Sequence, residues 1–185
     1  LQEWVKDVVL SNLGDEIKVL DELSLLPVPV PCEFLQHEQY LLELDDFALL
    51  RWFESGVELH HLVRNVRSTM LSKQDHAAAA NYWSQLEGDL ARLVEMHHVL
   101  SSGGDVESLL IRNAESLMVR SSAGLAALIG DAIFRHPTPS LHRMAAMVAI
   151  ERGEDDIASE HLSNIDAPDL EYSCLLYTSD AADDR

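Results

Sequence analysis

The sequence predicts an all-α fold in which antiparallel helix hairpins stack on one another, with an irregular helical bundle as the alternative. Three observations lead to this prediction. Apolar residues recur every three or four positions over most of the 185 residues, as they do on one face of a helix. The alternation typical of strands is nearly absent. The connections between the apolar segments are short, which makes successive helices antiparallel neighbours.

The first 26 residues predict two N-terminal helices, because their apolar positions follow helical spacing on both sides of Gly14. Asp15 is a suitable N-cap for the second of these helices. The sequence PVPVPC follows, and its prolines lack the backbone donor and bias the preceding residues towards extended backbone. We therefore expect a Pro-rich linker at 27–33 and a helical-repeat domain at 34–173.

The repeat domain is expected to consist of helices that begin at capping residues and end at glycines. Thr138 is the expected N-cap of one helix, with Pro139 at its first position, and Ser121 or Ser122 caps the helix before it. Gly103 and Gly104 form a helix stop. The expected helices cover 35–53, 57–71, 77–86, 90–100, 105–119, 122–134, 139–153 and 155–165.

Small residues stand where the last two expected helices would cross. Ala146 and Ala158 let the two backbones approach closely, and Leu162 and Ile165 are large enough to fill the groove to the next pair. This pattern resembles a tetratricopeptide repeat and favours a TPR-like α-solenoid. A weaker echo lies 32 residues earlier, at Ala114, Ala126 and Ile133.

The charge balance narrows the classes of partner. The chain has 13 Lys and Arg against 32 Asp and Glu, a net charge of −19, which repels phosphate backbones and argues against nucleic acid. No apolar run reaches the ~18 residues of a membrane span, so we expect no membrane insertion by this fragment. We expect a cytoplasmic protein without a cofactor or catalytic residues, at the cytoplasmic face of the inner membrane if an N-terminal anchor precedes it.

The positive charges are concentrated in one window. Residues 112–150 carry four arginines against two acidic residues, whereas both flanking regions are acidic. Arginine suits ion pairs at interfaces, so this window is the candidate contact with an acidic segment of a partner. The alternative is that these arginines complement helix ends and neighbouring acids. The candidate partner-binding residues are Arg112, Arg120, Arg135 and Arg143.

Two Glu-x-x-His motifs offer a function of another class. On a helix, this spacing puts both side chains on one face, and di-iron carboxylate bundles use two such motifs with two further glutamates. The alternative to a binding protein is therefore a metal-dependent helical-bundle enzyme. Its candidate ligands are Glu58, His61, Glu95 and His98.

The last 12 residues, CLLYTSDAADDR, resemble the translation of a transposon adapter used in sequencing libraries. We therefore expect residues 174–185 to be an adapter contamination of a metagenomic fragment and not native sequence. Their removal takes away three Asp and one Arg and changes the net charge from −19 to −17. Cys32 is then the one remaining cysteine.

The stretch from Gly104 to Leu162 resembles the C-terminal repeats of the lipopolysaccharide assembly protein B family. Gly104-Asp-Val-Glu107, Arg135-His-Pro-Thr138 and Leu141-His-Arg-Met144 carry the resemblance. It implies tetratricopeptide repeats on a membrane-anchored adaptor that presents the deacetylase of lipopolysaccharide synthesis to a membrane protease. The family's anchor and its cysteine-rich C-terminal metal knuckle have no counterpart in this sequence. The adapter-like tail begins at about the place where the knuckle would begin, so truncation is the alternative to a true absence of the knuckle. Other envelope repeat proteins, including the HemY-type family, are similar in the same way.

The sequence thus favours a non-enzymatic helical-repeat adaptor that holds a partner helix or peptide in a concave groove. Bacterial envelope lipopolysaccharide regulation is the setting that the resemblance implies.

Overall fold

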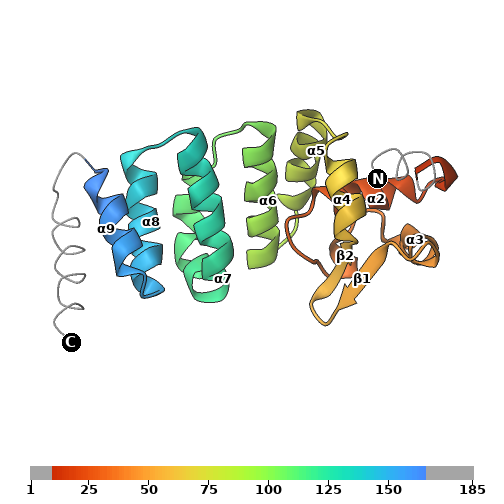
Figure 1. The fold of residues 1–185 in the computed structure, drawn as a ribbon, viewed down its shortest axis with the longest axis horizontal. Coiled ribbons are helices and arrows are strands. Elements are labelled where there is room, and N and C mark those ends of the chain that lie inside the picture. Colours follow the sequence, from red (N-terminus) through yellow and green to blue (C-terminus); the bar gives the residue numbers. More distant parts are fainter. Residues whose placement is uncertain (1–9, 166–185) are drawn as a thin grey trace. The chain divides into compact units, whose positions relative to one another are not determined.

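The computed structural model describes residues 10–165, and these residues are mostly helical, which agrees with the predicted all-α class at that level (Figure 1). The chain divides into two compact units, Leu1–Leu86 (unit 1) and Glu87–Arg185 (unit 2). The division therefore falls between residues 86 and 87, whereas the sequence predicted a boundary at 27–33. The first N-terminal helix and the adapter-like tail lie outside the described residues.

Unit 1 combines short helices with one β-hairpin. Helix α2 forms the centre of its core, with Val19 and Leu20 fully buried, and packs mainly on α4. The elements of unit 1 are η2 (Leu10–Asn12), α2 (Ile17–Leu25), η3 (Cys32–Phe34), η4 (Glu38–Tyr40), α3 (Leu41–Asp46), β1 (Leu50–Phe53), β2 (Gly56–Leu59), α4 (His61–Ser68) and α5 (Lys73–Trp83).

The β-hairpin corrects the prediction of helices over 35–53 and 57–71. Strands β1 and β2 pair antiparallel, and Trp52 lies opposite Val57. Val57 is completely buried while Trp52 is half exposed, so the hairpin has an inner and an outer strand. The two apolar segments predict two helices because short apolar segments give the same signal in a helix and in a buried strand.

The expected linker at 27–33 contributes to the core of unit 1. Val30 is fully buried, and it exchanges two backbone hydrogen bonds with Val57, at 3.2 and 2.9 Å. Val30 has a proline on each side, and proline is tolerated at the edge of a sheet because its missing backbone N–H removes no hydrogen bond between strands there. Around Val30 the segment is therefore extended, as its prolines predicted, and it pairs with β2, whereas its last residues begin the 3-10 helix η3.

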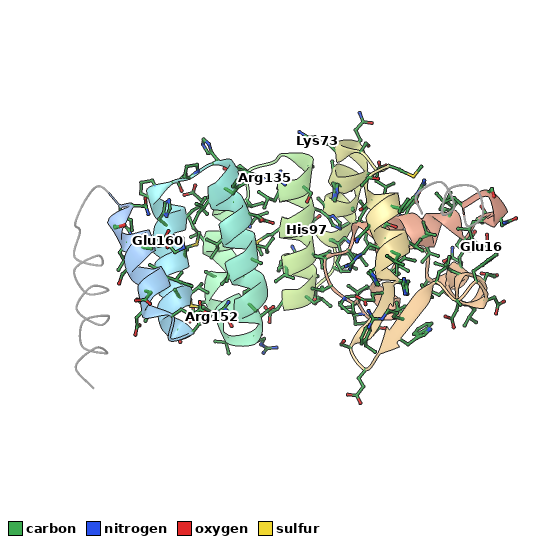
Figure 2. All side chains as sticks on the ribbon, viewed as in Figure 1. Glu16, Lys73, His97, Arg135, Arg152 and Glu160 are labelled. Atoms are coloured by element: carbon green, nitrogen blue, oxygen red, sulfur yellow. The ribbon has the colours of Figure 1, made fainter. Side chains whose placement is uncertain are left out.

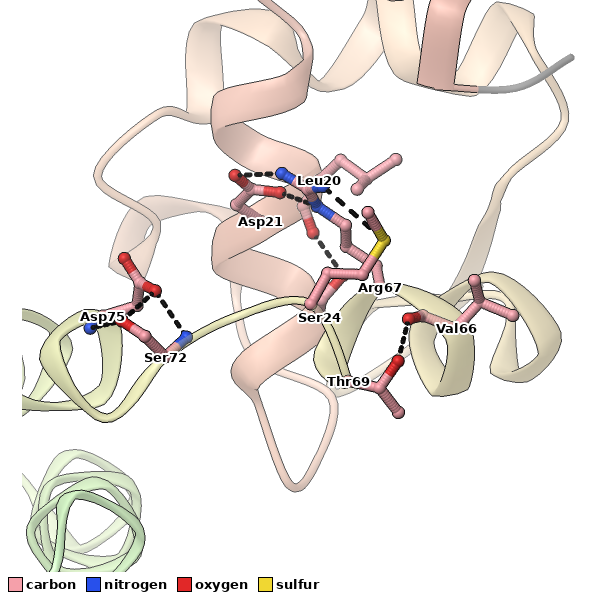
Figure 3. A network of polar contacts seen from close by, with 9 residues as sticks. Leu20, Asp21, Ser24, Val66, Arg67, Thr69, Ser72 and Asp75 are labelled. Atoms are coloured by element: carbon pink, nitrogen blue, oxygen red, sulfur yellow. Dashed lines mark hydrogen bonds and ion pairs between the residues drawn. The ribbon is translucent and has the colours of Figure 1, made fainter. Parts of the chain in front are cut away.

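Polar contacts fasten helices α2 and α4 to each other (Figure 3). The Arg67 guanidinium donates two hydrogen bonds to the Asp21 carboxylate, at 2.5 and 2.9 Å. The predicted cap of α2 is wrong: Glu16 occupies the N-cap position, and the Asp15 carboxylate pairs instead with Lys18 Nζ at 2.8 Å.

The regular elements in the described part of unit 2 are all helices. Its helices are α6 (Asp89–Ser102), α7 (Glu107–Arg135), α8 (Pro139–Glu151) and α9 (Asp155–Ser163). Each packs mainly on its neighbours along the chain, so α6 to α9 follow one another side by side (Figure 1). One predicted stop and one predicted cap are confirmed: Gly103 ends α6 in the left-handed conformation, and the Thr138 hydroxyl caps α8 by accepting the N–H of Leu141.

Helix α7 is a hairpin of two helical arms. Ser121 has non-helical backbone angles, φ −152° and ψ 48°, as the predicted break at this position requires. A straight helix would separate Glu107 from Arg135 by about 42 Å. Both residues instead line one cavity, and the Glu107 carboxylate accepts a hydrogen bond from the Thr138 hydroxyl at 3.1 Å. The first arm, 107–120, and the second arm, 122–135, therefore run in opposite directions.

By length and composition alone, α7 is long and apolar enough to cross a membrane, although the sequence analysis predicted no membrane-spanning segment. Core helices of soluble proteins satisfy the same criteria. Each arm has 14 residues and a length of about 21 Å, against roughly 30 Å of hydrocarbon in a bilayer. The break at Ser121 thus leaves two arms that are each too short to span.

Two glycine substitutions should have opposite effects on stability. Gly56 has φ 138°, and a Cβ there would lie 2.1 Å from the Val30 carbonyl oxygen, so Gly56→Ala should lower the free energy of unfolding by about 3 kcal/mol. Gly130 lies in α7 with open space around it, so Gly130→Ala should raise stability by about 0.5–1 kcal/mol. Urea denaturation followed by circular dichroism measures both changes. A Gly56→Ala protein as stable as the parent would contradict the described hairpin.

Candidate protein-interaction site

A cavity of about 400 Å³ opens in unit 2 where the α6–α7 turn meets the α7–α8 turn. Its inner surface is apolar, and its rim is polar. The apolar lining residues are Leu100, Val106, Ala132 and Leu141, and the polar or glycine ones are Gly103, Gly104, Asp105, Glu107, Arg135 and His136.

The α6–α7 turn is tight because it is built from two glycines. Gly103 adopts φ 91°, and a Cβ on Gly104 would lie 2.8 Å from a methyl group of Val99. The Asp105 carboxylate then accepts the backbone N–H of Glu107 at 2.9 Å, which satisfies a free donor at the start of α7. Asp105 thus binds the start of α7 from the position before Val106, which is the N-cap residue.

Two side chains hold the facing turns together. Thr138 caps α8 through its hydroxyl oxygen, and the same hydroxyl donates to Glu107 at the start of α7. Arg135 lies at the end of the second arm of α7 (Figure 2). Its guanidinium donates to the Leu100 carbonyl in the last turn of α6 at 2.7 Å. A cation at the C-terminal end of α6 also complements the helix dipole.

The cavity can therefore accept an apolar side chain while its rim binds polar groups. Its volume lies within the range of small-molecule and side-chain pockets, with an apolar wall and few polar groups. His136 is exposed at the rim, and Arg135 keeps guanidinium donors beyond the one that it gives to Leu100. This combination suits recognition of a peptide that carries an apolar anchor.

Of the four candidate arginines, only Arg135 lines this cavity. Arg112 is exposed on the first arm of α7, and Arg143 is half-buried on α8. Arg120 lies 3.3 Å from the Asp89 carboxylate at the start of α6. Arg120 and Arg135 thus make contacts within unit 2, which matches the alternative of arginines at helix ends beside neighbouring acids.

The structure does not place the two Glu-x-x-His motifs on comparable helices. Glu58 lies on strand β2, and its carboxylate is 3.1 Å from Arg51 and 3.9 Å from Arg64, while His61 begins α4. The prediction that Glu58 and His61 share one helix face is therefore wrong, because the chain changes from strand to helix between them.

The second motif is helical. Glu95 and His98 lie one turn apart on α6, both are buried, and the Glu95 carboxylate pairs with Arg92. Glu58 and His61 belong to unit 1, whereas Glu95 and His98 belong to unit 2. In both motifs the glutamate forms an ion pair with an arginine, which is typical of a contact that stabilises a fold and not of a metal ligand.

Unit 1 contains a smaller cavity, of about 190 Å³, beside α2. There the Glu22 carboxylate accepts the N–H groups of Gln36 and His37, at 2.6 and 3.1 Å, and lies 3.1 Å from His37 Nδ1. Burial raises the pKa of Glu22 above its ordinary value, although these hydrogen bonds lower it. Glu22 therefore fastens the 36–37 segment to α2.

The sequence contains no local signal for the main cavity, although both segments of its polar rim are recognisable in it. Gly104 to Glu107 and Arg135 to Thr138 are helix ends and carry the family resemblance. The signal for their proximity is the break at Ser121. Because this break reverses the chain, it brings two segments that are 31 residues apart in the sequence to the same end of the hairpin.

The contact between the two turns predicts that substitutions of Thr138 lower the stability of the protein to different degrees. Thr138→Ala removes both the cap of α8 and the bond to Glu107, so stability should fall by about 1–2 kcal/mol. Thr138→Ser keeps the hydroxyl and should lose less than half of that. Denaturant unfolding of the three proteins measures the series. Equal losses for Ala and Ser would show that the threonine methyl group, and not the hydroxyl, stabilises the turn.

Comparisons with protein-family models, with curated proteins and with solved structures found no match to this chain.

Proposed function

We propose that unit 2 is a TPR-like adaptor module that binds a segment of a partner protein, and that the cavity between the α6–α7 and α7–α8 turns receives an apolar side chain of that segment. No cofactor takes part in this function. The single observation that carries the proposal is this cavity, because it joins an apolar wall to a rim with Arg135 and His136.

The packing of unit 2 supports the repeat architecture. Its helices pack chiefly on chain neighbours, as successive hairpins in a solenoid do. The two arms of α7 form one hairpin, and α8 with α9 forms the next. Glu107 and Pro139, which begin the two hairpins, are 32 residues apart, and this is the spacing of the sequence echo.

The crossing of the last hairpin also follows the predicted pattern. Ala146, Ala158 and Leu162 are all fully buried, and Ile165 is nearly so. Ala146, Leu162 and Ile165 form one buried cluster. Small residues at the crossing and larger ones beyond it are the features on which the tetratricopeptide resemblance rests.

Placement of the module in bacterial envelope regulation is part of the proposal. The two short segments that resemble the lipopolysaccharide assembly protein B family, Gly104 to Glu107 and Arg135 to Thr138, both contribute to the cavity. An adaptor of that kind acts at the cytoplasmic face of the inner membrane and binds protein partners, and the same role is proposed for this chain.

A cavity-filling substitution tests the binding site. Ala132 is buried in the cavity wall, so Ala132→Leu should occupy its space without lowering the melting temperature. Peptides are first selected on the immobilised full chain from a random display library. We expect the selected peptides to share one large apolar residue and to bind Ala132→Leu at least about 10-fold more weakly, a difference of about 1.4 kcal/mol. Fluorescence anisotropy measures the binding.

Ala127→Leu is the matched control, because Ala127 is an exposed alanine on the same arm of α7 and does not line the cavity. Its peptide affinity should equal that of the parent. His136→Ala, at the rim, should weaken binding by a smaller factor. Equal affinity of the selected peptides for Ala132→Leu and Ala127→Leu would exclude the cavity as the binding site, and failure to select any peptide would contradict the adaptor function.

A further inference from the structure

A second feature of unit 2 lies on α8 and α9, and its residues are not among those that line the main cavity. The imidazole rings of His142 on α8 and His161 on α9 face each other, with 5.4 Å between the ring centroids. Their Nδ1 atoms are 3.1 Å apart, and both side chains are half-buried. Two ring nitrogens that face each other across two helices form either a single hydrogen bond or a pair of metal ligands.

We propose that His142 and His161 bind a divalent transition-metal ion through their Nδ1 atoms, and that the ion fastens α9 to α8. The ion belongs to the class that prefers imidazole nitrogen, which includes Zn²⁺, Ni²⁺ and Cu²⁺.

The separation of the two nitrogens fits a shared ion. Bond lengths to Zn²⁺ of about 2.0–2.1 Å and the separation of 3.1 Å give an N–metal–N angle of about 95–102°. This value lies between the right angle of square-planar or octahedral sites and the wider angle of a tetrahedral site. Little movement of the two rings is therefore needed for binding.

The tautomers of the two rings are also compatible with a metal. A neutral ring that carries its proton on Nε2 presents a lone pair at Nδ1. In the metal-free pair one Nδ1 carries a proton and the other accepts it. Binding requires only that this proton move to Nε2 of its own ring, through solvent, so that no proton is lost overall.

The helix that carries His161 is acidic. Helix α9 also carries Asp155, Asp156 and Glu160, and the negative charge of Glu160 acts on His161. Figure 2 labels Glu160 on this helix. A cavity of about 160 Å³ is lined in part by His161 and Glu154, and the Glu154 carboxylate is paired with Arg152 at 2.7 Å. The site is separate from the Glu-x-x-His motifs considered from the sequence.

Metal titration of the full chain tests the proposal. Chelator-treated protein is titrated calorimetrically with ZnCl₂ and with NiCl₂ at neutral pH, for the parent and for His142→Ala and His161→Ala. We expect each variant to bind one equivalent fewer than the parent, or to bind that equivalent at least about 10-fold more weakly. His61→Gln is the matched control, since it removes an exposed histidine of unit 1 and should leave the titration unchanged.

A second measurement does not depend on how the variants fold. Long-range ¹H–¹⁵N spectra of the parent should show Zn²⁺-induced shifts of Nδ1 in the His142 and His161 rings, and the melting temperature of the parent should rise with Zn²⁺. Unchanged Nδ1 resonances in these two rings at saturating Zn²⁺ would overturn the proposal. Titrations that are the same for the parent, His142→Ala and His161→Ala would also overturn it and leave a simple hydrogen bond between the rings.

Discussion

The backbone at Ser121 reverses the chain within one residue, and the arrangement of unit 2 depends on that reversal. With φ −152° and ψ 48°, this residue leaves helical geometry while the residues on both sides keep it. The two ends of α7 consequently come together, Glu107 reaches Thr138, and Arg135 reaches the end of α6. A continuous helix would separate Glu107 from Arg135 by about 42 Å. The cavity, its polar rim and the order of the hairpins all follow from this local change.

Local signals explain why the helices of unit 2 could be predicted from the sequence. Gly103 at a helix end, Thr138 before Pro139 and Ser121 between two apolar runs each act within a few residues, through backbone conformation or capping. The cavity lacks a signal of this kind. Leu100, Ala132 and Leu141 read as ordinary core positions, and they line one space only because separate turns meet.

Unit 1 was harder to predict because its structure depends on contacts between distant residues. Val57 is buried through pairing with Val30, 27 positions earlier, and a single sequence contains no local signal of that pairing. Apolar residues between 41 and 59 therefore suggested helices, whereas the chain forms a short helix and a hairpin. The same error affected the candidate metal ligands, since Glu58 lies on a strand and faces arginines.

The nearest-neighbour packing of α6 to α9 has a consequence for how unit 2 unfolds. When each helix depends mainly on the one before and after it, stability is close to a sum of local contributions, and opening can begin at an end without disrupting the middle. Such contacts have a low sequence separation, which favours fast folding. Helix α9 has nine residues, and in the described chain only α8 makes a substantial interface with it. Amide hydrogen exchange should therefore be faster in α9 than in the second arm of α7, where helices pack on both sides.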